Sequence, residues 1–375
     1  MASAASIIKK FMNVLDNTTS SGTAALTQAV KAVSNFTSWS QVITTMVKDC
    51  ASYSGNGTKF LKNMCGIVLN NSDTGAITGS DAGGSTTKTA ASIVPESGSW
   101  KYPSSTSFKI QGLTVTVPEK SSLSSAEKYI VGGLYTWWIK SSLNLIKNSY
   151  GMTFKESGTT VNNIKVSFYN RADNQVAYVS YGSGQKNHAL NMKINSYYLS
   201  DINKNNSNGS ASALLTYFDR TIAHEMAHAV MSANVDYFSK LPFSFKEGSA
   251  ELVHGIDDKR KSDILALASD STALRSAVFG SSGKSYAGGY IALRYFAKQA
   301  SKKRNPSVSA NVSENLWGDS TQVESLTAEN NFISQDSLST ILPEKSPASD
   351  LNFSPLSNFN PEIIVANSST LENNA

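Results

Sequence analysis

The chain has 375 residues, and 40% of them are hydrophobic, which is enough apolar side chain for a sizeable core. Charged residues make up only 16%, well below the average of about 25%. The net charge of +5 comes from scattered Lys and Arg residues. The densest basic cluster, 259–261, is short and follows two aspartates, so we expect a solvated surface and no nucleic-acid partner. No apolar stretch approaches the roughly 20 residues of a membrane span.

Low charge with abundant Ser, Thr and Asn is typical of a secreted or cell-surface protein. The N-terminus is unlike a signal peptide, because Lys9 and Lys10 follow the apolar residues instead of preceding them. We therefore expect export by a route without a recognisable N-terminal signal peptide. Cys50 and Cys65 are compatible with either a disulfide or two buried thiols. Two cysteines are too few for a zinc ribbon.

Composition and periodicity divide the chain into four parts. Residues 1–70 repeat apolar residues at helical spacing and predict a small helical N-terminal region. Residues 71–120 are rich in Gly, Ser and Thr and predict a linker, with one short strand at 113–118. Residues 121–302 hold the strongest patterns and form the predicted catalytic domain. Residues 303–375 contain five of the nine prolines and lose all periodicity, which is typical of a disordered tail.

The catalytic domain begins with the best-formed long helix. Ser124 and Glu127 have the spacing of a capping box, and Gly151 ends the helix. The adjacent Trp137 and Trp138 are predicted to lie in the core. Three strand-like segments follow, at 161–170, 175–182 and 188–199. Further helices are predicted at 212–232, 244–254, 262–268 and 285–300. Helices around a small sheet indicate an α+β fold.

The helix predicted at 212–232 contains the sequence TIAHEMAHAVM. His224 and His228 are four residues apart, so they lie on one face of the helix and can reach a single metal ion. Glu225 lies about 100° round from His224, where it can contact a water on the metal without being a ligand. The pattern predicts a Zn²⁺ site in which Glu225 is the catalytic base.

Eighteen residues separate His228 from Glu247, which begins the sequence EGSAELVHG. H-E-x-x-H followed by x18 and Glu resembles the gluzincin metallopeptidases, and E-G-x-A resembles their aminopeptidase branch. The resemblance implies a zincin-like catalytic domain, with a small sheet, an edge strand, an active-site helix and a helical lower part. It also implies that Glu247 is the third zinc ligand. The metzincin pattern is excluded, because neither its Gly nor its third His follows His228.

Two further roles follow from this resemblance. Glu251 stands where thermolysin-like enzymes place an acid that orients a ligand histidine, which agrees with the usual second hydrogen bond of a ligating imidazole. Tyr286 and Gly289 are similar to the aminopeptidase Y-x-x-G motif, whose tyrosine stabilises the oxyanion. Tyr290 is expected in the core. His254 is expected to be a surface or rim histidine.

Residues 120–300 together most resemble flagellinolysins and collagenase-like bacterial metallopeptidases. We therefore expect a zinc endopeptidase that hydrolyses proteins with a metal-activated water and a Glu general base. The strand at 188–199 is expected to be the sheet edge that binds an extended peptide, and His188 at its start is structural or surface-exposed. That segment carries no acid to hold a free amine, which disfavours an aminopeptidase. Inactive zincin domains of surface adhesins remain an alternative.

Overall fold

A computed structural model describes residues 4–67, 69, 93, 98–173, 175–214, 217–256 and 260–303. They group into two compact units. We call residues 93–241 the sheet unit, and we call residues 4–69 together with 242–303 the helical unit. A small mixed sheet with many helices confirms the α+β class. The predicted disordered tail and most of the predicted linker lie outside the described residues.

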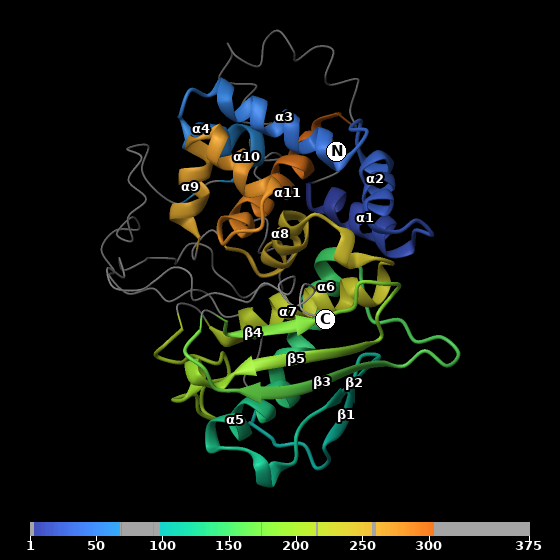
Figure 1. Ribbon diagram of the computed structural model, residues 1–375, viewed down its shortest axis with the longest axis vertical. Helices are drawn as coiled ribbons and strands as arrows, with labels where there is room; N and C mark the ends of the chain where they lie inside the picture. Colours follow the sequence, from blue (N-terminus) through green and yellow to red (C-terminus); the bar gives the residue numbers. More distant parts are fainter. Residues whose placement is uncertain are drawn as a thin grey trace. The chain divides into compact units, whose positions relative to one another are not determined.

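The sheet unit contains one five-stranded sheet, in the order β1-β2-β3-β5-β4 (Figure 1). The strands β2, β3 and β5 run parallel, and β1 and β4 are antiparallel to their neighbours. Along β5, buried and exposed residues alternate, which is typical of a sheet with one covered face. The strands are β1 (Ser107–Ile110), β2 (Leu113–Thr116), β3 (Asn162–Tyr169), β4 (Ala177–Ser180) and β5 (Ala189–Asn195).

The position of β5 corrects the prediction that the segment 188–199 forms the sheet edge. Strand β5 lies inside the sheet, paired in parallel with β3 and in antiparallel with β4. The edge next to β5 is the short strand β4, from the segment predicted at 175–182, and the other edge is β1. Position along the chain does not determine position in a sheet, because β5 pairs with both strands that precede it.

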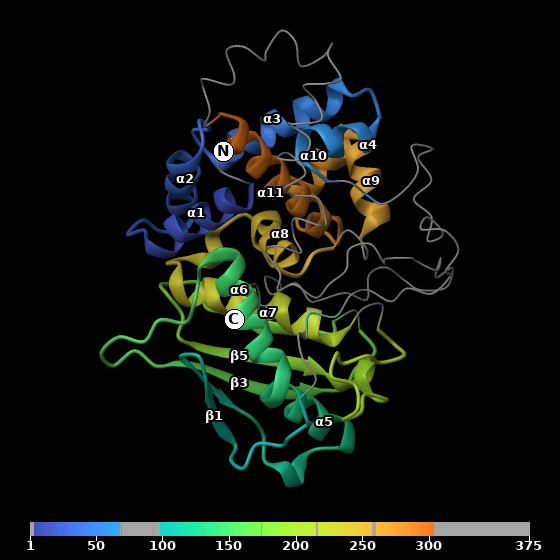
Figure 2. The same cartoon turned by 180° about the vertical axis from the view of Figure 1, so that it is seen from behind.

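A long helical segment covers one face of this sheet, in front of the strands in Figure 2. The predicted capping box of Ser124 and Glu127 is present, and Gly151 ends the helix at φ 73°. The buried indole of Trp138 packs edge-on against Phe218, with ring centroids 5.2 Å apart. It therefore supports the first turn of the helix that begins at Phe218. The long helical segment consists of α5 (Ser125–Gly133), a π-helical segment (Leu134–Trp138) and α6 (Ile139–Tyr150). The separate helix α7 (Phe218–Asn234) follows the strands.

The helical unit combines helices from both ends of the described chain. The first group is α1 (Ala4–Asn17), α2 (Gly22–Val33), α3 (Trp39–Ser52), α4 (Gly57–Phe60) and a π-helical segment (Leu61–Cys65). The second group is α8 (Phe243–His254), α9 (Lys261–Ser269), α10 (Ser271–Phe279) and α11 (Lys284–Lys303). Helix α10 has no counterpart among the predicted elements. No helix in the described part of the chain is both long and apolar enough to cross a membrane.

An aromatic cluster joins the two groups of helices. The ring of Phe11 on α1 lies 5.9 Å from Phe245 on α8 and 5.0 Å from Phe296 on α11. Trp39 at the start of α3 contacts the same two rings, at 5.2 and 5.9 Å. All four residues are buried. The sequence set residues 1–70 apart from the catalytic domain, whereas here the N-terminal helices share one core with α8 and α11.

Both cysteines are buried thiols, which decides between the two readings that the sequence left open. Cys50 donates to the carbonyl of Ala268 at 3.2 Å, and burial raises its pKa to about 11. Burial raises the pKa of Cys65 further. Because the thiolate is the reactive form, both side chains are packing residues at neutral pH.

The shared core predicts that a change in α1 destabilises the whole helical unit. Phe11→Ala should lower the free energy of unfolding by about 3–5 kcal/mol, as expected for a large buried aromatic side chain. Urea unfolding followed by circular dichroism measures the loss, and Lys10→Ala on the exposed side of the same helix is the matched control. A Phe11→Ala variant as stable as that control would show that residues 1–70 fold apart from α8 and α11.

Candidate functional site

The two histidines of the H-E-x-x-H sequence converge on one point. All 17 residues of α7 are buried, and His224 and His228 lie on successive turns of it. Their Nε2 atoms are 3.1 Å apart. A tetrahedral zinc with nitrogen ligands at 2.0–2.1 Å separates two such nitrogens by about 3.3 Å. The pair therefore fits two ligands of one ion, and without an ion it fits a hydrogen bond between the two rings.

The surroundings of His228 are aromatic. The ring of Tyr181, just after β4, lies 6.3 Å from the His228 ring, and that of Phe238 lies 6.2 Å from it. The two aromatic rings also pack edge-on against each other at 4.9 Å. This wall holds the imidazole in place and excludes water from that side.

Glu225 is fully buried beside the two histidines and is held by the sheet. Its Oε2 accepts a hydrogen bond of 2.8 Å from the backbone N–H of Val179 on β4. A buried carboxylate needs such donors, because burial without them is costly. The bond places the predicted base between α7 and the edge strand.

In the helical unit, Glu247 and Glu251 lie one turn apart on α8, and neither side chain is exposed. Glu251 accepts a hydrogen bond of 3.0 Å from Nε of Arg260. Its second carboxylate oxygen lies 3.2 Å from Nε2 of His254. Two groups that the sequence assigned to the surface, Arg260 and His254, are therefore buried around this carboxylate, each only 4% exposed.

Glycines set the crossing of α8 and α11. Gly248, next to Glu247, lies so close to Gly289 that a Cβ on Gly248 would overlap the Gly289 backbone. A Cβ on Gly289 would in turn overlap the carbonyl oxygen of Ser244. The glycines in the E-G-x-A and Y-x-x-G sequences thus let two helix backbones meet.

Tyr286 lies in the first turn of α11 and is 4% exposed. The guanidinium of Arg260 lies over its ring at 4.5 Å, and Phe243 packs edge-on at 5.9 Å. The hydroxyl of Tyr290, one turn on, accepts a 2.6 Å hydrogen bond from Arg294, as suits its expected place in the core. Tyr286, Arg260 and Glu251 thus form one connected group.

His188 has a structural environment. Its Nδ1 lies 2.8 Å from Oδ1 of Asn162 on the neighbouring strand. Burial, and next the nearby Lys186, lower the pKa of His188, against an opposing effect of Asp236. The side chain therefore tends to stay neutral and pairs β5 with β3, in keeping with the expected structural role.

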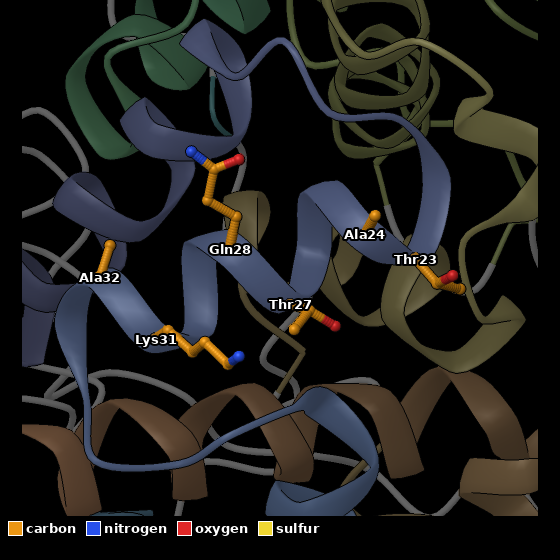
Figure 3. A pocket seen from close by; sticks show the side chains of 6 residues that line it. All are labelled: Thr23, Ala24, Thr27, Gln28, Lys31 and Ala32. Carbon is orange, nitrogen blue, oxygen red and sulfur yellow. The ribbon is translucent and has the colours of Figure 1, made fainter.

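A shallow open hollow lies on α2 (Figure 3). All six of its lining side chains come from that one helix, and they include no acid, histidine or cysteine. The lining residues are Thr23, Ala24, Thr27, Gln28, Lys31 and Ala32.

Two contributors to the site were not foreseen from the sequence. Val179 acts through its backbone, which no side-chain pattern reveals. Arg260 lies in the basic cluster 259–261, where a charge run indicates a solvated face. The neighbouring acids could have raised the possibility of an ion pair, but not with Glu251, nine residues away.

The sheet unit thus brings together His224, His228 and Glu225, and the helical unit brings together Glu251, His254 and Tyr286 through Arg260. No protein-family model matches this chain, and no curated protein or solved structure is significantly similar to it.

The burial of the Glu251–Arg260 pair predicts a large cost when one partner is removed. Arg260→Met should lower the free energy of unfolding by about 3–5 kcal/mol, because it leaves the Glu251 carboxylate buried without its cation. Urea titrations of chelator-treated protein measure this, with exposed Lys284→Met as the control. In a Glu251→Gln background the cost should shrink. Strictly additive effects would contradict the pairing.

Proposed function

We propose that this chain is a zinc-dependent endopeptidase with a zincin-like catalytic domain, in which α7 is the active-site helix. The observation that carries the proposal is the pair of Nε2 atoms 3.1 Å apart on a buried helix, with Glu225 on the same helix and its carboxylate bonded to the edge strand β4. One buried helix thus holds two metal-ligand nitrogens and a candidate base within five residues.

The proposed ligands are His224, His228 and Glu247. Two imidazole nitrogens and one carboxylate are the donor set of several catalytic zinc sites. The 18-residue spacing and the complete burial of Glu247 support the third ligand. When bound, Zn²⁺ would lower the pKa of its coordinated water towards neutrality. It would also polarise the substrate carbonyl.

The other residues of the proposed site would transfer protons or position the reacting groups. Glu225 takes a proton from the attacking water and later gives it to the leaving amine. Glu251, fixed by Arg260, orients a ligand histidine through the second ring nitrogen. Tyr286 donates a hydrogen bond to the negative oxygen that develops on the carbonyl.

The substrate would be an extended segment of a protein. Strand β4 is an edge of the sheet, and an extended peptide can add to a sheet edge by backbone hydrogen bonding. Its sequence, AYVS, contains no acid to hold a free amino terminus, which supports an endopeptidase over an aminopeptidase. A protein substrate and the low charge of the chain both suit action outside the cell.

Casein digestion by the full chain, with and without a chelator, tests the proposal alongside metal analysis. We expect about one zinc per chain, cleavage inside the casein chains, and loss of both on chelation with recovery on adding zinc. Release of single N-terminal residues would favour an aminopeptidase. Zinc without any cleavage would favour an inactive zincin domain, and absence of zinc would overturn the proposal.

The ligand assignment predicts different outcomes for the two glutamates of α8. Glu247→Ala should lose most of the zinc, because two histidines alone form an incomplete site. Glu251→Ala should keep more, since it removes a supporting contact, which typically costs 10–100-fold in affinity. Zinc titration with a competing chelator measures both. If Glu247→Ala keeps zinc and Glu251→Ala loses it, the two roles are exchanged.

The base assignment predicts that Glu225→Gln keeps zinc and the fold but loses activity. A glutamine of nearly the same shape cannot accept the proton, so casein cleavage should fall by about 10²–10⁴-fold. Metal content and the thermal unfolding temperature serve as internal controls. Turnover like that of the wild type would contradict this mechanism.

The oxyanion role predicts a selective effect of Tyr286→Phe. Removing one hydroxyl should lower kcat by about 10- to 1,000-fold with KM and zinc content nearly unchanged. Steady-state kinetics on a fluorogenic peptide separate the two constants. Tyr290→Phe is the matched comparison, because its hydroxyl already pairs with Arg294. If only Tyr290→Phe lowers kcat, the donor lies one turn further along α11.

A further inference from the structure

The geometry of the sheet unit points to a positioning role for the backbone amide of Val179. We propose that this N–H, on the outer side of edge strand β4, fixes the carboxylate of Glu225 and interrupts the substrate-binding edge at that residue. The inference rests on the proposed function in two respects, namely that Glu225 is the base and that the substrate binds along β4. The hydrogen bond itself does not depend on it.

The pairing of β4 with β5 shows which backbone groups face outwards. Residues of an antiparallel strand turn their N–H and C=O groups alternately towards and away from the neighbour. Asn195 donates to the carbonyl of Val176 at 2.8 Å, so Val176, Tyr178 and Ser180 face β5. Ala177 and Val179 face away, which agrees with the bond from Val179 to Glu225.

This bond uses a donor that an edge strand otherwise offers to an incoming peptide. The outer edge of a sheet presents unpaired N–H and C=O groups that template another strand. At Val179 the N–H is occupied by Glu225, so a peptide cannot pair with it. A substrate strand must therefore have a gap in its hydrogen bonds beside the base. We infer that the bond to be cleaved lies at this gap, beside Glu225.

The same bond pre-organises the base. A free glutamate side chain has several rotamers, and ordering it costs conformational entropy. Here one carboxylate oxygen is fixed by the amide at 2.8 Å, and the Val179 side chain is itself fully buried. Positioning of this kind raises the rate of the chemical step without tightening substrate binding.

Hydrogen exchange tests the bond directly. In protein labelled with ¹⁵N-valine and ¹⁵N-tyrosine, the Val179 amide should be protected although it faces the sheet edge. In Glu225→Ala its exchange should rise by at least about ten-fold, while that of Tyr178, which faces β5, stays the same. An unprotected Val179 amide in the wild type, or protection that survives Glu225→Ala, would overturn the inference. These results are readable in metal-free protein, whether or not it cleaves casein.

Kinetics test the consequence. Val179→Pro removes only the outward N–H and no bond to β5, and proline is tolerated at such edge positions. Its kcat on a fluorogenic peptide should fall by about ten-fold or more, with KM within about two-fold and zinc content unchanged. Val179→Ala, which keeps the N–H, is the matched control. Equal effects of the two substitutions, or a change confined to KM, would refute the positioning role.

If the wild type itself cleaves nothing, the proposed function fails while the exchange result still decides whether the bond exists. If the wild type is active and the Val179 amide is unprotected, the proposed function survives and this inference fails.

Discussion

The burial of α7 along its whole length is the constraint on which the sheet unit depends. A helix without an exposed face is normally apolar all round, yet this one carries acids, imidazoles and an arginine. Each buried polar group needs a partner, since an unsatisfied one costs about 1–3 kcal/mol. Asp219 accepts from the N–H of Ile93 at 2.9 Å, and Asn234 donates to the carbonyl of Thr153 at 2.9 Å. The polar groups between them include the H-E-x-x-H residues.

The helical unit meets a similar demand with different means. Glu251 is held between Arg260 and His254, and the guanidinium of Arg260 also lies over Tyr286. At Gly248 and Gly289 the backbones of α8 and α11 are in close contact. The residues next to these glycines are therefore held on two tightly packed helices. Sites on packed helices hold their geometry better than sites on loops, which suits groups that must be pre-organised.

Local signals were enough to predict most elements and the candidate residues. The Ser124 capping box, the glycine stop at Gly151 and the three strand segments are found where the sequence placed them. Interactions between distant segments were not predictable in the same way. The edge position of β4 depends on how three strands pair, and the burial of Arg260 depends on a carboxylate nine residues earlier. Neither leaves a periodic pattern in one segment.

The two histidines could also be explained as a structural pair that shares one proton, and the energetics of burial argue against this reading. A structural pair of histidines would not require a buried carboxylate on the adjacent side of the helix. Glu225 is nevertheless placed there, and an edge-strand amide is committed to it. A well-packed hydrophobic side chain at this position would avoid the desolvation of a charge. Under the proposed function this carboxylate has a task, because it would be the base beside a metal-bound water.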